Sequence, residues 1–375
     1  MLKHLPWLLL VPVLAMAADD PVAARLDAVF APLVQGRSPG LAVLVRQDGR
    51  TLFQRGYGVT DLRSATPIDP ETNFRLASFT KQFTAMSVML LVKDGKLRYD
   101  DPLTKVFPDF PAYGQAITIR HLLTHTSGLP DYEEVMEAGA QRWTAQDQIR
   151  DDEVLKLLKA QTKARFAAGT SWSYSNSGYV VLGLVVAKVS RMPFGEFLQK
   201  RIFAPLRMDH TLAYRAGSNN IVHRAYGHSK QQDHFVERDQ SSTSATLGDG
   251  GIYSNLTDLA KWDEALARNT LLDASAMKEA WTPAKLANGA PTRWPREKNE
   301  DNLNPGKPVS YGFGWFLDPY KDQKRMWHTG STTGFRTVIQ RFSQHKLTVI
   351  LLCNRTDLDA AQLSLKAADA VLAAH

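Results

Sequence analysis

Apolar positions in the first quarter of the chain change from helical to strand-like spacing and back. Residues 21–35 carry apolar side chains at helical spacing, and two β-rich runs follow at Leu41–Arg46 and Thr51–Tyr57. The segment Gln47–Arg50 between these runs contains Asp-Gly, a strong hairpin signal. Phe79–Lys93 again has a helical stripe. The pattern predicts a helix, a β-hairpin and a second helix in that order.

The middle of the chain is predicted to be mostly helical. This block runs from Gly95, which is placed to stop the preceding helix, to about residue 285. Within it, Gly178–Val189 is apolar on nearly every side, which is typical of a helix buried all round. Residues 283–310 hold several Pro, Asn and charged residues, and they predict a long surface loop.

The C-terminal part of the chain returns to strand-like patterns and closes with a predicted amphipathic helix at Leu358–Ala373. The predicted strands are Tyr311–Leu317, Arg325–Thr329, Thr337–Phe342 and Leu347–Leu352. Strands from both ends of the chain can join one antiparallel sheet flanked by the terminal helices, with the helical block inserted. We therefore expect an α/β (α+β) fold. Residues 18–75 and 305–375 would form the sheet lobe, and residues 76–304 a mainly helical lobe of the same unit.

The first seventeen residues have the three parts of a secretory signal peptide. A cationic start at Met1–His4 is followed by an apolar run from Leu5 to Met16 and by the small residues of Ala15–Ala17. The apolar run is too short to span a bilayer as a permanent helix, and an N-terminal anchor is the alternative. No other segment has the length and apolar character of a membrane span. We expect residues 1–17 to be removed, with export to a bacterial periplasm or beyond.

Composition excludes several classes of protein. The 375 residues are 44% hydrophobic, so a disordered or low-complexity chain is excluded. The net charge of +7 is spread along the chain without a basic stripe, so nucleic acid is not expected as a partner. The single cysteine, Cys353, excludes an intrachain disulfide framework and a cysteine-bound metal cluster. Since Cys353 ends a predicted buried strand, we expect a packed thiol with no chemical role.

Two histidines, His121 and His125, are four residues apart and can share one helix face. The zinc-protease pattern requires Glu directly after the first histidine, but Leu122 stands there. No nearby carboxylate has the right spacing either. We therefore expect both histidines to be structural, and no metal site.

Ser78 and Lys81 stand three residues apart at the start of the predicted Phe79 helix. This spacing places both side chains on one helix face. A serine hydroxyl is a weak nucleophile and needs a base beside it. A lysine can be that base where burial disfavours its ammonium form, and Phe79 and Phe83 supply apolar surroundings. The alternative is a helix-capping serine beside an exposed lysine.

Two further clusters also combine polar side chains that can take part in a reaction. Tyr174 and Asn176 lie two apart in a polar loop before the buried helix, so they project to the same side if the loop is extended. His328, Thr329 and Gly330 end a predicted strand, where the first two can donate hydrogen bonds and the glycine allows close approach of a substrate backbone. The alternatives are an N-cap asparagine with a packing tyrosine, and an ordinary strand end.

The order Ser-x-x-Lys, Tyr-x-Asn and His-Thr-Gly resembles that of the penicillin-recognising serine hydrolases. This group holds class C β-lactamases, DD-peptidases and related esterases and D-aminopeptidases. Four longer stretches are similar to the same group: Leu76–Lys81, His121–Pro130, Tyr174–Tyr179 and Gly248–Ser254. The resemblance runs from about residue 22 to the C-terminus. It implies a β-lactamase/DD-peptidase-like fold, in which the site lies between the sheet and the helical lobe.

The resemblance also implies roles for individual residues. Ser78 would be the acylated nucleophile, and Lys81 and Tyr174 would share the acid–base work, with the base for acylation left open. Asn176 would position the substrate amide. The backbone N–H groups of Ser78 and Ser331 would form the oxyanion hole. No metal or organic cofactor is implied.

One departure concerns the strand motif, where class C β-lactamases usually have Lys-Thr-Gly and this chain has His328. An imidazole holds a substrate carboxylate less firmly at neutral pH than an ammonium does. His-Thr-Gly is more similar to the DD-peptidases and D-aminopeptidases of the group. Arg336, which follows Gly334 and Phe335, is a second candidate for a fixed positive charge.

Three functions follow as hypotheses. The first is an exported serine hydrolase that acts through an acyl-enzyme on an amide or ester, as DD-peptidases, D-aminopeptidases and esterases do. The second is a class C-like β-lactamase, and the third is a non-catalytic penicillin-binding or sensing protein. The expected partner is a small-molecule or peptide substrate, with cell-wall peptide as one candidate. The sequence does not choose among D-peptide, ester and β-lactam, and it predicts no oligomeric state.

Overall fold

The computed structural model describes residues 21–296 and 304–373. The predicted signal peptide at residues 1–17 lies outside this part, and so do residues 297–303 of the predicted surface loop. Across the two described ranges, no helix is both long enough and apolar enough to cross a membrane.

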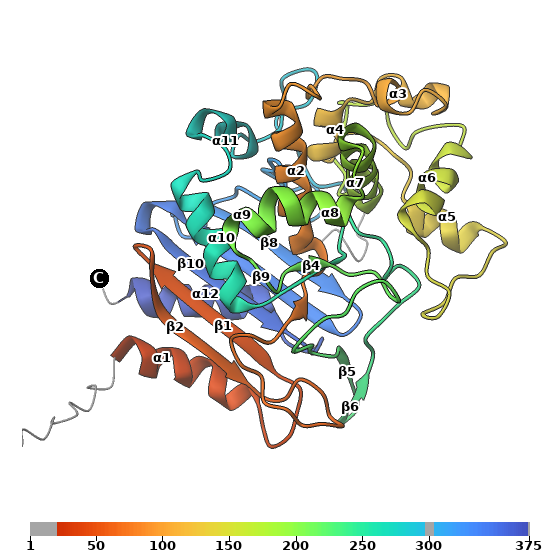
Figure 1. Ribbon diagram of the computed structural model, residues 1–375. Helices are drawn as coiled ribbons and strands as arrows, with labels where there is room; N and C mark the ends of the chain where they lie inside the picture. Colours follow the sequence, from red (N-terminus) through yellow and green to blue (C-terminus); the bar gives the residue numbers. More distant parts are fainter. Residues whose placement is uncertain (1–20, 297–303, 374–375) are drawn as a thin grey trace, which may run out of the picture.

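The central sheet of the described chain has five antiparallel strands in the order β2-β1-β10-β9-β8 (Figure 1). These strands are β1 (Leu41–Gln47), β2 (Arg50–Tyr57), β8 (Arg325–Thr332), β9 (Phe335–Phe342) and β10 (Leu347–Cys353). Strand β1 pairs with β10, so that Leu41 lies opposite Cys353. This pairing confirms that strands from both ends of the chain join one sheet. The predicted hairpin turns at Asp48 and Gly49, which have φ angles of 50° and 77°.

The two terminal helices, α1 (Pro21–Phe30) and α12 (Ala360–Leu372), cover one face of this sheet (Figure 1). Apolar side chains of both helices pack there against alternate residues of the strands, including Val338 of β9. Cys353 is fully buried in the same layer, and burial raises the pKa of its thiol to about 12. The thiol therefore packs as a small apolar group, as expected from the sequence.

The other face of the sheet carries the inserted helices, with α2 (Lys81–Lys93) packed against α7 (Asn176–Ser190). Helix α7 extends the predicted buried helix by a few residues at its start. The remaining helices of the block are α3 (Leu103–Val106), α4 (Ile119–Leu123), α5 (Tyr132–Ala138), α6 (Asp151–Lys159), α8 (Phe194–Leu198), α9 (Ala204–Leu206), α10 (Leu256–Arg268) and α11 (Ala274–Ala280).

Helix α10 is fixed to the sheet by a buried ion cluster around Asp263. The carboxylate of Asp263 accepts hydrogen bonds from Arg46 of β1 at 2.8 Å and from Arg341 of β9 at 2.9 Å. Thr348 of β10 donates a third bond, at 2.8 Å. Three strands are thereby tied to one turn of α10, although α10 belongs to the segment that the sequence assigns to the helical lobe.

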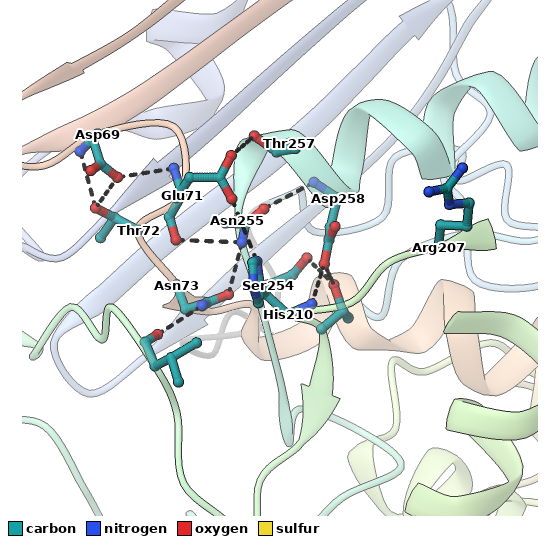
Figure 2. Close-up of polar contacts among 12 residues, drawn as sticks. Asp69, Glu71, Thr72, Asn73, Arg207, His210, Ser254, Asn255, Thr257 and Asp258 are labelled. Atoms are coloured by element: carbon teal, nitrogen blue, oxygen red, sulfur yellow. Dashed lines mark hydrogen bonds and ion pairs between the residues drawn. The ribbon is translucent and has the colours of Figure 1, made fainter. Parts of the chain in front are cut away.

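The start of α10 is tied to two loops by the polar contacts in Figure 2. Asn255 caps the helix by accepting from the Asp258 N–H at 2.9 Å, and its side-chain amide donates to Asn73 at 3.3 Å. The Asp258 carboxylate accepts from the backbone of His210 at 2.9 Å. Glu71 contacts Thr257 of the same turn. The position of α10 is therefore set at both its first and its middle turns.

Two features differ from the sequence-based expectation. The middle block also contains strands, since β3 (Phe74–Arg75), β7 (Ile252–Ser254) and β4 (Leu212–Ala213) form a small sheet, and β5 (His228–Gln231) pairs with β6 (His234–Glu237). The predicted strand Tyr311–Leu317 is wrong. This segment instead folds back on itself, because Gly312 N–H donates to Trp315 at 2.8 Å and Gly314 adopts a φ of 78°.

Candidate active site

Ser78 lies in η2 (Ala77–Thr80), a single 3₁₀ turn between β3 and α2. The turn is sharp, because Ala77 adopts the left-handed φ of 51° that non-glycine residues rarely take. Gly250 passes beside it, so that a side-chain carbon added to this glycine would lie 3.6 Å from Ala77. The helix predicted from Phe79 therefore begins as a tight turn, and that turn presents a half-buried Ser78 at the boundary between sheet and helices.

Lys81 is the first residue of α2 and is fully buried. Its Nζ donates to Ser78 Oγ at 2.9 Å, to Asn176 Oδ1 at 2.8 Å and to the backbone oxygen of Asp249 at 3.0 Å. An ammonium has three donors, and these acceptors match all three. We call Ser78, Lys81, Asn176 and the Asp249 carbonyl the polar cluster. The spacing argument from the sequence is thus realised as a direct contact between Ser78 and Lys81.

Asn176 and Tyr174 lie where the chain enters α7. Ser175 is the N-cap of the helix, since its Oγ accepts from the Gly178 N–H at 3.0 Å. Asn176 therefore does not have the capping role considered from the sequence, and its side chain turns to Lys81. The Lys81 Nζ lies 4.9 Å from the centre of the Tyr174 ring, a cation–π distance.

Gly330 of β8 faces the segment that precedes Ser78. A side-chain carbon on Gly330 would lie 2.0 Å from the Leu76 backbone oxygen, and the neighbouring Thr337 hydroxyl donates to that same oxygen at 2.7 Å. The sequence suggested that this glycine admits a substrate backbone. In the structure, the close approach that it permits is to the protein's own Leu76, which brings strand β8 against η2.

His328 is buried two residues before Gly330 on the same face of β8. Its Nδ1 lies 2.6 Å from the Thr329 carbonyl and must donate to it, so in the neutral ring Nε2 accepts from the Tyr311 hydroxyl at 3.0 Å. Burial, followed by the nearby charge of Lys81, lowers the pKa of His328 to about 3. The ring is therefore neutral at pH 7, and both nitrogens are engaged within the protein.

Thr329 and Ser331 are two residues apart on the edge strand β8, so their side chains lie on the same face of the sheet. Thr329 lies opposite Val338 of β9 and is half-buried, and Ser331 lies opposite Arg336 and is exposed. Strand β8 forms one edge of the sheet beside η2. At Trp327 this edge already pairs with Phe316, at 2.9 Å in both directions. Beyond such a bridge, an edge strand carries backbone groups that no neighbouring strand occupies.

Arg336 lies on the other face of the sheet. Along β9 it alternates with Thr337, which contacts Leu76, and it shares the face of Val338 and Gln340, which pack toward α12. Its guanidinium donates to the carbonyls of Thr332 and Phe335, each at 2.8 Å. This position does not support a role for Arg336 in holding a substrate carboxylate.

Aromatic and imidazole rings line the site beside the polar cluster. The ring centres of His125 and Tyr174 are 4.5 Å apart, those of His125 and Tyr311 are also 4.5 Å apart, and those of Phe316 and His328 are 5.3 Å apart. We call this group the aromatic wall; its members are His125, Trp172, Tyr174, Tyr311, Phe316 and His328. Trp294, from the segment predicted as a surface loop, packs on Trp172 at 4.8 Å. Part of that loop therefore covers the wall.

The two histidines predicted to be structural have different surroundings. His121 is half-buried at the start of α4, where its Nδ1 accepts from the Thr118 N–H at 3.1 Å in a capping box. His125 is buried in the aromatic wall, and its Nδ1 accepts from the Ser175 N–H at 3.0 Å. No signal in the sequence indicates this second contact, because the two residues are 50 positions apart. The Asp249 carbonyl was missed for a similar reason, since a backbone oxygen has no side-chain signature.

An antiparallel sheet, an inserted helical lobe and, between them, a serine in contact with a buried lysine define the β-lactamase and penicillin-binding protein fold. The Beta-lactamase family profile matches residues 26–374, and the chain belongs to this family. The predicted resemblance and fold class are thereby confirmed.

Individual relatives agree with this assignment. Penicillin-binding protein 4* of Bacillus subtilis (strain 168) is 31% identical over 362 residues, which cover 93% of this chain and 75% of that protein. Among solved structures, the D-amino acid amidase from Ochrobactrum anthropi SV3 superposes with a TM-score of 0.78 at 23% identity, covering 95% of this chain and 99% of the amidase. An octameric penicillin-binding protein homologue from Pyrococcus abyssi gives 0.76 at 24% identity, with coverage of 94% and 77%. At these identities the structural likeness shows the fold alone.

Proposed function

We propose that the protein is an exported serine hydrolase that cleaves an amide or ester bond through an acyl-enzyme at Ser78. The observation that carries this proposal is the 2.9 Å contact between Lys81 Nζ and Ser78 Oγ, made by a lysine with no exposed surface. A buried amine in contact with a hydroxyl is the arrangement that activates a serine nucleophile. Membership in the Beta-lactamase family supports the same chemistry.

In this proposal the acylation step uses the polar cluster together with Tyr174 and Ser331. Ser78 Oγ attacks the carbonyl carbon of the substrate, and its proton passes to the neutral amine of Lys81 or to the phenolate of Tyr174. The backbone N–H groups of Ser78 and Ser331 would stabilise the oxyanion. The same proton then goes to the leaving nitrogen or oxygen as the bond to carbon breaks. Asn176 both receives a hydrogen bond from Lys81 and can contact the substrate amide.

Deacylation completes the reaction with a water molecule as the second nucleophile. The water gives one proton to the same base and adds to the acyl carbon, and the Ser78 oxygen leaves with that proton. Every proton is thus returned, and the proposed cycle needs no metal or organic cofactor.

Our proposal for the substrate class rests on His328, a member of the aromatic wall. A neutral His328 offers no positive charge to a carboxylate, and Arg336 lies on the opposite face of the sheet. A penicillin or a free acyl-D-alanyl-D-alanine carries such a carboxylate. We therefore favour an amide or ester with an uncharged group at this position, of the D-aminopeptidase or esterase type, over a class C-like β-lactamase. The main chain of β8 at Thr329, rather than the Thr329 side chain on the face of Val338, would pair with the backbone of a peptide substrate, including one from the cell wall.

Export is part of the proposal because the first seventeen residues match a secretory signal peptide. An exported hydrolase of this family would meet its substrate in the periplasm or outside the cell. N-terminal sequencing of the protein secreted by a bacterial host would show a chain that begins at Ala18. An unprocessed chain that begins at Met1 would contradict this part of the proposal.

The nucleophile is tested by covalent labelling. The wild type should react with a fluorescent alkyl phosphonate and lose reactivity in the variant Ser78→Ala. Ser87→Ala is the matched control, because Ser87 is a buried serine of α2, the helix that follows Ser78, and its hydroxyl donates to the Phe83 carbonyl. Labelling that persists in Ser78→Ala would show that the nucleophile is a different residue.

The substrate class is tested by comparing nitrocefin, a short acyl ester and an acyl-D-alanyl-D-alanine peptide. We expect the highest kcat/KM with the ester. Fast turnover of nitrocefin would instead establish the β-lactamase alternative. Failure to turn over any substrate, together with an unlabelled Ser78, would favour the non-catalytic binding protein.

A further inference from the structure

His125 is the one member of the aromatic wall that contacts the backbone on both sides of Tyr174. Its carbonyl accepts from the Ser173 N–H at 3.0 Å, and its ring Nδ1 accepts from the Ser175 N–H at 3.0 Å. The Tyr174 ring lies 4.5 Å from the imidazole, centre to centre. One residue therefore fixes the peptide groups before and after Tyr174 as well as one side of its ring.

The backbone of His125 is adapted to this position. It adopts a φ of 59°, in the left-handed region that asparagine, aspartate and histidine enter most readily among non-glycine residues. The side chain is only 1% exposed. A residue at this site must therefore accept a left-handed conformation, fill the space between aromatic rings and present one hydrogen-bond acceptor.

The imidazole is neutral and in a single tautomer. Because Nδ1 accepts a hydrogen bond, the ring proton is on Nε2. Burial first, and then the nearby charge of Lys81, lower the pKa of His125 well below its usual value. The rings of Trp172, Tyr174, Tyr179 and Tyr311 face the imidazole from the surrounding elements. The acceptor at Nδ1 is thus present at neutral pH.

We propose that His125 is a positioning residue of the active site, which holds the segment Ser173–Ser175 so that Tyr174 lies against Lys81 and Asn176 enters α7 in contact with Lys81. The role rests on the proposed serine hydrolase function. It differs from an ordinary packing role because it depends on one acceptor atom at the position of Nδ1. A displacement of about 1 Å at a catalytic group costs about 10²-fold in rate, so loss of this acceptor has a large expected effect.

The test compares three substitutions that differ in where they place a polar atom. His125→Asn keeps an acceptor near Nδ1 and tolerates a positive φ. His125→Gln extends its amide toward the position of Nε2, and His125→Leu has no acceptor. The matched controls are His121→Asn and His121→Leu, because His121 also accepts one backbone N–H at Nδ1 but stands outside the aromatic wall.

The kinetic readout is kcat and KM for the ester substrate. We expect His125→Leu and His125→Gln to lower kcat by about 10²-fold with little change in KM, and His125→Asn to recover at least about tenfold of that loss. His121→Leu should lower the melting temperature and leave kcat unchanged. Equal kcat in folded His125→Asn and His125→Leu, or a folded His125→Leu with wild-type kcat, would overturn the proposal.

A second readout is independent of catalysis. The backbone amide of Ser175 should exchange with solvent about 10²-fold faster in His125→Leu than in the wild type, and at nearly the wild-type rate in His125→Asn. If the wild-type enzyme is not labelled at Ser78, the proposed function fails, but this exchange experiment still decides the positioning role. Unchanged protection of Ser175 in His125→Leu would show that His125 does not hold the segment.

Discussion

The polar cluster and the aromatic wall meet at Lys81, but they control ionisable groups in opposite ways. In the polar cluster, every donor of Lys81 has an oxygen acceptor between 2.8 and 3.0 Å. In the aromatic wall, burial keeps ionisable groups uncharged: it lowers the pKa of His125 and His328 and raises the pKa of Tyr311 well above its usual value. One side of the site therefore stabilises a charge, and the other excludes charge.

The difference bears on the proposed role of Lys81 as both donor and base. Hydrogen bonds to Asn176 and Asp249 favour the ammonium, whereas the neutral rings next to it offer only a cation–π contact and little solvent. These influences oppose each other. Such a balance suits a group that must take and return a proton in each cycle.

Removal of the lysine head group is the strongest test of this balance. Lys81→Met should lower kcat/KM by about 10⁴-fold, because the serine loses its base. Stability should change little: three acceptors lose their donor, at about 1–3 kcal/mol for each one that stays buried, while the buried charge that opposes folding is also removed. Rates are measured with the ester substrate and stability by thermal unfolding. Retention of more than a tenth of the wild-type kcat/KM would assign the base to Tyr174.

Gly330→Ala tests the close contact between β8 and the segment that precedes Ser78. The added carbon would lie 2.0 Å from the Leu76 oxygen, and neither backbone can yield without moving β8 or η2. We expect a loss of about 3 kcal/mol in the free energy of unfolding and about 10²-fold in kcat. Urea unfolding and ester hydrolysis measure the two effects. A fully active and stable variant would show that β8 can shift without disturbing Ser78.

The two parts of the site differ in how far the sequence predicted them. Ser78 and Lys81 are local in sequence, so helical spacing alone predicted that they would meet. The contact of His125 with Ser175 and the Asp249 carbonyl depend on tertiary packing, for which the sequence carries no periodic signal. The sheet was predictable because β1, β2, β9 and β10 alternate or are continuously apolar. The segment Tyr311–Leu317 was mispredicted because its apolar side chains suggested a strand, while its two glycines allow a turn.

A substitution at Asp263 is expected to change stability without changing activity, because Asp263 contacts neither the polar cluster nor the aromatic wall. Asp263→Asn should leave Arg341 without its countercharge and Arg46 with only Glu264, and lower the free energy of unfolding by about 3 kcal/mol. The kcat of the folded fraction should equal that of the wild type. Denaturant unfolding and active-site titration with the phosphonate give both values. A fall in kcat per labelled site would mean that α10 transmits strain to Ser78.

The smallest expected effect tests whether the aromatic wall excludes charge. The folded-state pKa of His328 is about 3, below the ordinary value of 6.5. The unfolded chain therefore takes up a proton at this residue as pH falls below 6.5, while the folded chain does not until about pH 3. The resulting stability is complete above pH 6.5 and is lost progressively toward pH 3, with about 2 kcal/mol lost between pH 7 and 5.

His328→Gln removes this titration and retains an oxygen that can accept from the Tyr311 hydroxyl. The free energy of unfolding of the variant should therefore fall by about 2 kcal/mol less than that of the wild type between pH 7 and 5. His125 titrates in the same direction in both proteins and does not contribute to the difference. Denaturant unfolding at several pH values measures the two slopes. Parallel slopes would mean that His328 takes up a proton in the folded protein as readily as in the unfolded chain, and the wall would then present a cation to a substrate carboxylate below about pH 6.5.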